Sequence, residues 1–138
     1  MTETPSIPDT TSAFLEALGL EVTEATGTRV AGYVDLGERH HTPWGVVHGG
    51  VYATIVESAG SIGGSLAVAD RGQFAVGLHN STDFLRASNG CRARVTAEPI
   101  IQGRTQQLWL VEIVDDATGK DLARGQLRLQ NVPLPKQD

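Results

Sequence analysis

The sequence predicts an α+β fold in which one antiparallel sheet wraps around a single central helix. Gly49 to about Ala69 is apolar and lacks period-two alternation, so it fits a helix that is buried on most of its faces. Four later segments alternate apolar and polar residues as strands do. Because strands and helices do not alternate along the chain, one sheet packed around one helix is the simplest arrangement.

The elements around this helix can be placed in chain order. A short helix is expected from about Thr11 to Leu18, because Gly19 stops it. A hairpin over Leu20–Leu36 turns at "ATGT", and the loop "GERHHTPWG" precedes the long helix. We expect one domain over residues 1–138, with flexible tails at 1–10 and 133–138. Four strands are expected to form a meander: Phe74–Arg86, Cys91–Gln102, Thr105–Asp115 and Leu122–Val132.

Three glycines stand inside the predicted helix, at Gly60, Gly63 and Gly64. Each weakens intrinsic helicity by up to about 1 kcal/mol relative to alanine. A helix that carries this cost usually gains close packing against another backbone, so the glycines predict such a contact.

The composition excludes several classes of protein. With 138 residues, 40% of them hydrophobic and 20% charged, the chain can form a globular core. Its net charge of −5 and its lack of clustered Lys or Arg argue against nucleic-acid binding. No apolar run approaches the roughly 18 residues of a membrane span, and the N-terminus lacks the pattern of a secretory signal. We therefore expect a cytoplasmic protein that binds neither nucleic acid nor a membrane.

The cysteine and the histidines show no clear metal-binding or nucleophilic pattern. Cys91 is alone, which excludes an internal disulfide, and it opens an alternating run as a strand residue would. Ser61 in "AGSIG" resembles a nucleophile elbow but lies mid-helix rather than at a strand-to-helix turn. We expect no metal and no cofactor, because no metal-ligand spacing is matched by the candidate ligands. These candidates are His40, His41, His48, Glu57 and His79.

A sharper signal is the pairing of "HGG" at the start of the long helix with Glu57. The free amides of Gly49 and Gly50 and the positive end of the helix dipole favour an oxyanion there. Glu57 is the one carboxylate in "HGGVYATIVESAGS", whose apolar character favours a functional over a solvent-facing acid. Ser61 lies four residues further on the same helix face, where it can hydrogen-bond a water or the carboxylate.

One helix cannot easily bring both groups to the same carbonyl. Glu57 lies about 10 Å along the axis from Gly50, at ~1.5 Å per residue. Two neighbouring antiparallel helices could, with the amide from one and the carboxylate from the other. A two-fold dimer would supply this arrangement twice.

The pattern G-x-x-H-G-G at residues 45–50, followed by Glu57 and Ser61, resembles the hotdog-fold acyl-CoA thioesterases. The resemblance is strongest to the PaaI-like group, which includes the Arthrobacter-type 4-hydroxybenzoyl-CoA and the 1,4-dihydroxy-2-naphthoyl-CoA thioesterases. It extends through "VGLHNSTDFLR", "GRTQQLWLVEIVDDATGK" and "ARGQLRL". It implies homodimers or homotetramers with active sites at the dimer interface. It also implies hydrolysis of an acyl-CoA, with aromatic acyl groups favoured.

The resemblance implies roles for individual residues as well. Glu57 would be the nucleophile or the general base for water, and the Gly49 amide would be the oxyanion donor. His48 would assist around the thioester, and Ser61 would position water. The positions implied for substrate binding are Gly50, Thr42, Arg86, Arg104 and Thr105.

The resemblance is more specific for four of these positions. Arg86, Arg104 and Thr105 match positions that hold the CoA nucleotide or the pantetheine arm. Thr42 stands where such enzymes usually have Asn or Gln, and its side chain is shorter and reaches less far than a carboxamide.

Two other functions stay open at this point. A non-catalytic hotdog module would bind acyl-CoA without releasing thiol, and Thr42 would then mark the lost activity. A metal-dependent enzyme using the histidines would lose activity with chelators.

Overall fold

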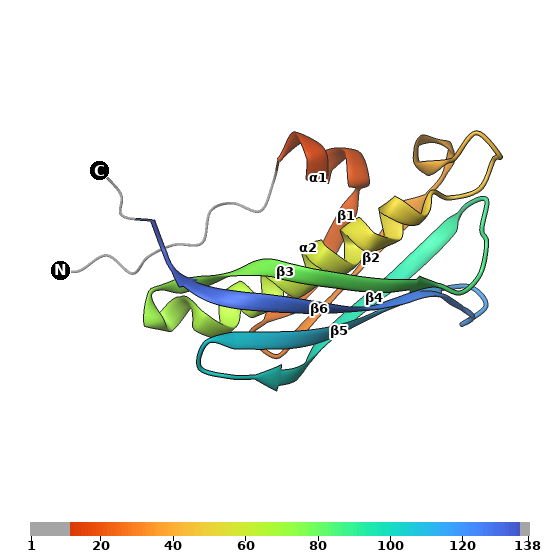
Figure 1. Cartoon of the computed structure of the whole chain (residues 1–138). Coiled ribbons are helices and arrows are strands. Elements are labelled where there is room, and N and C mark those ends of the chain that lie inside the picture. The colour runs from red at the N-terminus through yellow and green to blue at the C-terminus, as the bar shows by residue number, and fades with distance from the viewer. Residues whose placement is uncertain (1–11, 136–138) are drawn as a thin grey trace.

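The computed structural model describes residues 12–135, in which a single long helix crosses the inside of a curved six-stranded sheet (Figure 1). Two helices, α1 and α2, occupy Ala13–Leu18 and Gly49–Val68, and two short 3₁₀ turns, η1 and η2, occupy Glu38–His40 and Ala69–Arg71. The strands are β1 Leu20–Thr26, β2 Arg29–Leu36, β3 Gln73–Phe84, β4 Cys91–Gln102, β5 Gln106–Asp115 and β6 Asp121–Pro133. The predicted α+β arrangement is confirmed.

The order of the strands differs from the expected meander. The sheet runs β1-β2-β4-β5-β6-β3, and all neighbours are antiparallel. The last three strands form a meander, but β3 pairs with β6 at the far edge instead of with β4. The prediction was wrong there because alternation shows that a segment is a strand and not which neighbour it pairs with.

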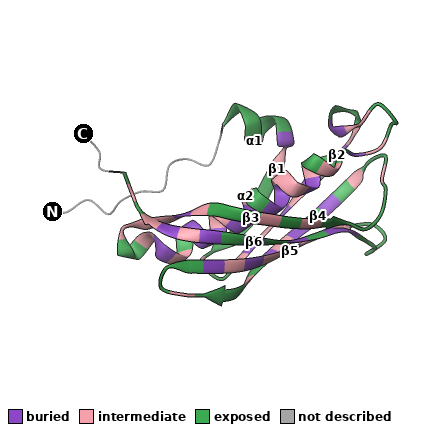
Figure 2. Cartoon of the chain, in the orientation of Figure 1, coloured by how far each residue is buried: buried purple, intermediate pink, exposed green. Residues whose placement is uncertain are grey.

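The sheet buries one face of α2. Buried residues alternate with less buried ones along β5 and β6 (Figure 2), and the side chains of Trp109, Ile113, Leu127 and Leu129 have no exposed surface. The helix residues that face them include Ile55, whose side chain is also fully buried. Each such side chain contributes about 1.5–3 kcal/mol by leaving water, so this layer is the core of the fold.

The three helix glycines lie on this buried face. A Cβ at Gly63 would overlap the ring of Trp109, and one at Gly60 or Gly64 would meet the side chain of a β6 leucine. The expectation of a backbone contact was therefore wrong at these positions, because side chains of the sheet fill the space. A close backbone contact occurs instead at Gly27, where a Cβ would lie 2.8 Å from the Cα of Ala67.

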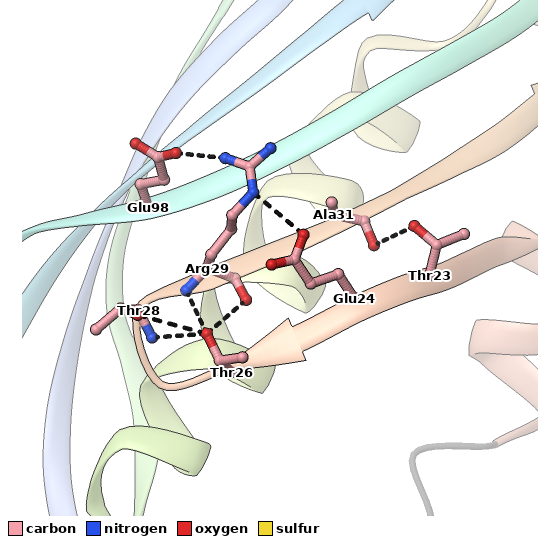
Figure 3. Close-up of polar contacts among 7 residues, drawn as sticks. All are labelled: Thr23, Glu24, Thr26, Thr28, Arg29, Ala31 and Glu98. Atoms are coloured by element: carbon pink, nitrogen blue, oxygen red, sulfur yellow. Dashed lines mark hydrogen bonds and ion pairs between the residues drawn. The ribbon is translucent and has the colours of Figure 1, made fainter.

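The turn between β1 and β2 is held by its own polar side chains (Figure 3). Thr26 Oγ1 accepts hydrogen bonds from the amides of Thr28 and Arg29, at 3.2 and 3.0 Å. The Arg29 guanidinium pairs with Glu24 on β1 and with Glu98 on β4. These contacts close the turn and join it to β1 and β4.

The segment Gly49–Arg71 is long and apolar enough to cross a membrane, because it contains an 18-residue window with a mean hydropathy of 1.2. The expectation that no apolar run approaches this length was therefore wrong. Half of this window is buried inside the fold, as in the core helix of a soluble protein, so length and composition are weak evidence for a span.

Both ends of the described chain are held by hydrogen bonds. The start expected for the first helix, Thr11, and the tail at 1–10 lie outside the described residues, and α1 is capped by the Ser12 hydroxyl. Pro133 still belongs to β6, and the Leu134 amide donates to the Gly72 carbonyl at 2.9 Å. The strand thus extends into the segment expected to be a tail, and residues 136–138 of that segment lie outside the described residues.

A Gly63→Ala substitution tests the packing of α2 on the sheet. We expect it to lower the free energy of unfolding by about 1–3 kcal/mol, because the added methyl group forces the Trp109 ring to move. Urea denaturation measures the change. Gly37→Ala is the matched control, since nothing lies within 4 Å of its added Cβ, and it should change stability by less than about 0.5 kcal/mol. Equal effects of the two variants would contradict the packing account.

Candidate active site

An open groove of about 1180 Å³ follows the face of α2 that the sheet leaves uncovered. Glu57 and Ser61 both lie in it, as the sequence predicted for two residues of one helix face. The remaining lining comes from α1, β1, α2 and β3: Phe14, Leu15, Val22, Ala25, Ala53, Thr54, Ser58, Ile62, Ser65, Leu66, Asn80, Thr82 and Phe84. The groove is thus mainly apolar, with a single carboxylate, and it suits an apolar ligand that carries one reactive polar group.

Glu57 is exposed in the isolated chain. Its carboxylate lies beside β3, with Oε1 3.7 Å from the position that a Cβ on Gly77 would occupy. The side chain therefore sits over the edge strand, at the boundary between the groove and solvent.

The N-terminus of α2 presents a free amide. His48 is the N-cap, and its Nδ1 accepts from the Gly50 amide at 2.8 Å. Because Nδ1 is an acceptor, neutral His48 carries its proton on Nε2. The Gly49 amide finds no acceptor within residues 12–135, so it is available to an anion at the positive end of the helix.

Glycine is required at position 49 for close packing. A Cβ there would overlap the ring of Phe84, which comes from the end of β3 and also lines the groove. The Phe84 ring in turn lies 6.3 Å from the ring of Tyr52. Phe84 thus contacts both the residue that carries the free amide and the groove.

The loop before α2 is held by hydrogen bonds between its histidines and backbone groups. His40 is buried; its Nδ1 accepts from the Gly37 amide at 3.1 Å, and its Nε2 donates to the Leu18 carbonyl at 2.9 Å. The His40 carbonyl accepts from the His48 amide at 2.8 Å. His41 Nε2 lies 2.6 Å from the Asn89 carbonyl. These rings therefore hold the loop in place, and no group of three or more potential metal ligands is found among residues 12–135.

Thr42 has a structural role in this loop. Its hydroxyl accepts from the Trp44 amide at 3.1 Å, and its carbonyl accepts from the Gly45 amide at 3.1 Å. Gly45 has a φ of 79°, which a side chain would disfavour. A threonine at position 42 thus closes a tight turn that leaves Trp44 88% exposed at its tip.

A single chain does not bring all predicted site residues together. The Gly49 amide and Glu57 are separated by about two turns of α2, or about 12 Å at 1.5 Å per residue. Arg86 follows β3 near the start of β6, where its amide donates to the Leu122 carbonyl. Arg104 and Thr105 form the turn between β4 and β5, beside the other end of α2. Both arginines are exposed.

Sequence reasoning missed a polar pair on β3. Asn80 Nδ2 donates to the Ala53 carbonyl at 2.9 Å, and Thr82 Oγ1 donates to Asn80 Oδ1 at 2.6 Å. Ala53 lies four residues before Glu57, so its carbonyl is the helical acceptor for the Glu57 amide. Asn80 therefore fixes the helix turn that carries Glu57. The alternation in "NSTDF" places residues 80, 82 and 84 on one face and could have indicated this set.

Two other ionisable groups are unsuited to act as base or nucleophile. Burial raises the pKa of Tyr52 to about 12, so its phenol stays neutral at ordinary pH. Burial likewise raises the pKa of the Cys91 thiol, which disfavours the thiolate. Cys91 opens β4, as predicted for a strand residue.

Comparison with known proteins identifies the family. The sequence profile of the thioesterase superfamily matches residues 45–121, more than half of the chain. The chain belongs to the thioesterase superfamily. The matched range includes His48, Gly49 and Glu57, whereas Thr42 lies just before it.

Individual relatives agree with this assignment. The thioesterase is 39% identical over 132 residues to "Putative esterase Rv1847" of Mycobacterium tuberculosis, with 94% of each chain covered. The solved structure of that protein superposes with a TM-score of 0.86, covering 91% of this chain and 100% of the other. "Proofreading thioesterase EntH" of Cronobacter turicensis is 33% identical over 74% of each chain. "1,4-dihydroxy-2-naphthoyl-CoA hydrolase" of Listeria monocytogenes is 28% identical over 73% of this chain and 81% of its own.

These findings confirm the hotdog fold and the enzyme class predicted from the G-x-x-H-G-G and Glu57 pattern. The thioesterase is a thioester hydrolase, which favours catalysis over the alternative of a binding-only module.

The buried hydroxyl of Tyr52 gives a pH-dependent prediction. It has no hydrogen-bond partner among the described residues, so Tyr52→Phe should be as stable as the wild type at neutral pH. The folded phenol ionises near pH 12 and the unfolded one near pH 10. The unfolded state therefore loses the proton first, and wild-type stability falls as pH rises through this window.

Urea denaturation at pH 8 and at pH 11 measures this effect. We expect the wild type to lose about 1 kcal/mol more than Tyr52→Phe between the two values. An equal loss in both proteins would show that Tyr52 ionises as freely when folded as when unfolded.

Proposed function

We propose that this thioesterase hydrolyses acyl-CoA thioesters with an aromatic acyl group, giving the free acid and CoA. The observation that carries the proposal is the position of Glu57, the single carboxylate of an apolar groove on the uncovered face of α2. The groove offers apolar surface to a ring, and the carboxylate offers a base or nucleophile to its thioester carbonyl. The similarity to 1,4-dihydroxy-2-naphthoyl-CoA hydrolase supports this class of substrate, and the similarity to the thioesterase EntH supports the reaction.

The reaction needs a group that activates the attack and a group that stabilises the oxyanion. As a general base, Glu57 takes a proton from a water that adds to the carbonyl carbon; the C–S bond then breaks, and the CoA thiolate takes up a proton. As a nucleophile, Glu57 forms a mixed anhydride with release of CoA, and water then hydrolyses the anhydride. In both routes the Gly49 amide donates to the developing oxyanion.

The active site is completed by a second copy. The ~12 Å between the Gly49 amide and Glu57 of one chain is too long for one carbonyl. Two antiparallel α2 helices related by a two-fold axis bring the Gly49 amide of one protomer near the partner subunit's Glu57, and do so twice. The assembly is a homodimer or a pair of dimers, and the enzyme acts in the cytoplasm.

Residues around these groups orient the substrate. His48 carries its proton on Nε2 when neutral, so it can donate toward the thioester while Nδ1 keeps its bond to Gly50. Gly50 leaves space for the carbonyl beside the backbone. Ser61 positions the attacking water one helical turn from Glu57.

The CoA part of the substrate lies outside the groove. Arg86, Arg104 and Thr105 bind the nucleotide and the pantetheine arm, and the two arginines lie beside opposite ends of β6. Thr42 acts on the substrate by closing the turn before α2, where its hydroxyl accepts from the Trp44 amide. Its side chain is shorter than the carboxamide that related enzymes usually have at this position and reaches less far.

The first experiment is thiol release from a panel of aromatic and aliphatic acyl-CoAs, followed with a chromogenic disulfide reagent. We expect turnover to be fastest with aromatic thioesters and resistant to chelators. Glu57→Ala should lower kcat by about 10²–10⁴-fold, the usual size of a general acid–base contribution.

Glu112→Ala is the matched control. Glu112 is a carboxylate on β5 between the buried residues Val111 and Ile113, so it lies on the outer face of the sheet and does not line the groove. It should leave turnover unchanged. Retained turnover in a dimeric Glu57→Ala variant would refute the role of Glu57. Absence of turnover with any thioester, while binding persists, would refute hydrolysis.

A further inference from the structure

A fully bonded carboxamide lies buried between α2 and the sheet. Gln107 is 2% exposed, and its Nε2 donates to the Gly64 carbonyl of α2 at 2.9 Å and to Asn131 Oδ1 at 2.8 Å. Its Oε1 accepts from Trp109 Nε1 at 2.9 Å and from Gln102 Nε2 at 3.2 Å. These are the four hydrogen bonds that a carboxamide can make. The side chain is therefore fixed in one orientation.

Asn131 joins Gln107 to the turn between β4 and β5 by hydrogen bonds. Its Nδ2 donates to the carbonyls of Gly103 and Arg104 at 3.3 and 3.2 Å, and its amide donates to the Thr105 carbonyl at 2.8 Å. Three consecutive carbonyls thus point at one residue that is 6% exposed. Since the two ends of a peptide unit point in opposite directions, the amides of Arg104 and Thr105 face away from Asn131.

The outward side of this turn is suited to an anion. Arg104 and Thr105 are exposed, and Arg104 forms no ion pair within residues 12–135. No hydrogen bond from the amides of these two residues is found in the same part of the chain. Outward amides next to a guanidinium and a hydroxyl are the donors that phosphate groups prefer.

The same network fixes a second turn. Gln102 Nε2 donates to the Gly27 carbonyl at 2.7 Å, and Gly27 belongs to the β1–β2 turn that the Thr26 hydroxyl closes (Figure 3). Gly27 packs closely on Ala67 of α2. Both turns are thereby tied to the C-terminal half of the central helix.

We propose that Gln107 and Asn131 are positioning residues that hold the 103–105 turn ready for the phosphate groups of CoA. This inference rests on the proposed function, because it takes acyl-CoA as the substrate. Buried apolar residues of similar size would stabilise the fold about as well as a bonded polar network. What the carboxamides add is a defined backbone orientation at the turn, which lowers the entropy lost when the nucleotide binds.

The test compares Asn131→Ala with the wild type on two substrates, an acyl-CoA and the same acyl group on pantetheine. We expect KM for the acyl-CoA to rise about tenfold with kcat unchanged. This pattern arises when a variant loses binding energy that is equal in the ground state and the transition state. The kinetics with acyl-pantetheine should not change, since it lacks the nucleotide. Equal losses with both substrates, or an unchanged KM for acyl-CoA, would overturn the proposal.

A control variant, a substitute variant and a double variant complete the test. Gln130→Ala is the matched control, because the Gln130 side chain bonds Gln106 and the Asn131 carbonyl and not the turn; it should leave both substrates unaffected. If Asn131→Ala does not fold, Asn131→Ser, which keeps one short donor, takes its place with the same expected pattern. Adding Asn131→Ala to Arg104→Ala should raise KM little further, because residues that act through one contact are not additive.

The outcome is separable from that of the proposed function. If the wild type hydrolyses no thioester, calorimetric binding of CoA and of pantetheine to the same variants replaces the kinetics. A tenfold weaker affinity for CoA alone would support the positioning role, and equal affinities in the wild type and Asn131→Ala would overturn it.

Discussion

The contact between the glycine face of α2 and the large side chains of the sheet is the constraint on which the rest of the structure depends. Gly60, Gly63 and Gly64 leave space that Trp109 and two β6 leucines fill, so the sheet closes on one face of the helix at van der Waals distance. Glycine weakens the helix locally, and the burial of large apolar side chains outweighs that cost. The rest of α2 is left outside the core, and Glu57 lies at the edge of this uncovered surface, beside β3.

The site follows from this division of the helix into two faces. The loop that enters α2 is anchored by the buried His40, which fixes His48 as the N-cap and leaves the Gly49 amide free. Asn80 holds the helix turn before Glu57 from the other side. At the far end, Gln107 and Asn131 join α2 to the turn that carries Arg104. The two ends of one helix thus supply different parts of a site that we propose to be completed by a second copy.

The sequence predicted the helix, the strand segments and the shared helix face of Glu57 and Ser61, because each depends on local periodicity and spacing. It did not predict that β3 pairs with β6, since strand order depends on long-range contacts that alternation does not encode. The role of Asn80 was missed for the same reason: its acceptor, Ala53, lies on another element. The turn function of Thr42 could not be read either, because a threonine that closes a turn and one that binds a substrate look alike in sequence.

The central claim is that one active site uses the Gly49 amide of one protomer and the partner subunit's Glu57. Co-expression of Glu57→Ala with Gly49→Ala tests it, because a Cβ at position 49 overlaps the Phe84 ring and displaces the Gly49 amide. Each variant alone should be inactive. The mixture should recover about a quarter of wild-type thioester hydrolysis, because about half of randomly paired dimers are mixed and each mixed dimer has one intact site. No recovery in mixed dimers would contradict the claim.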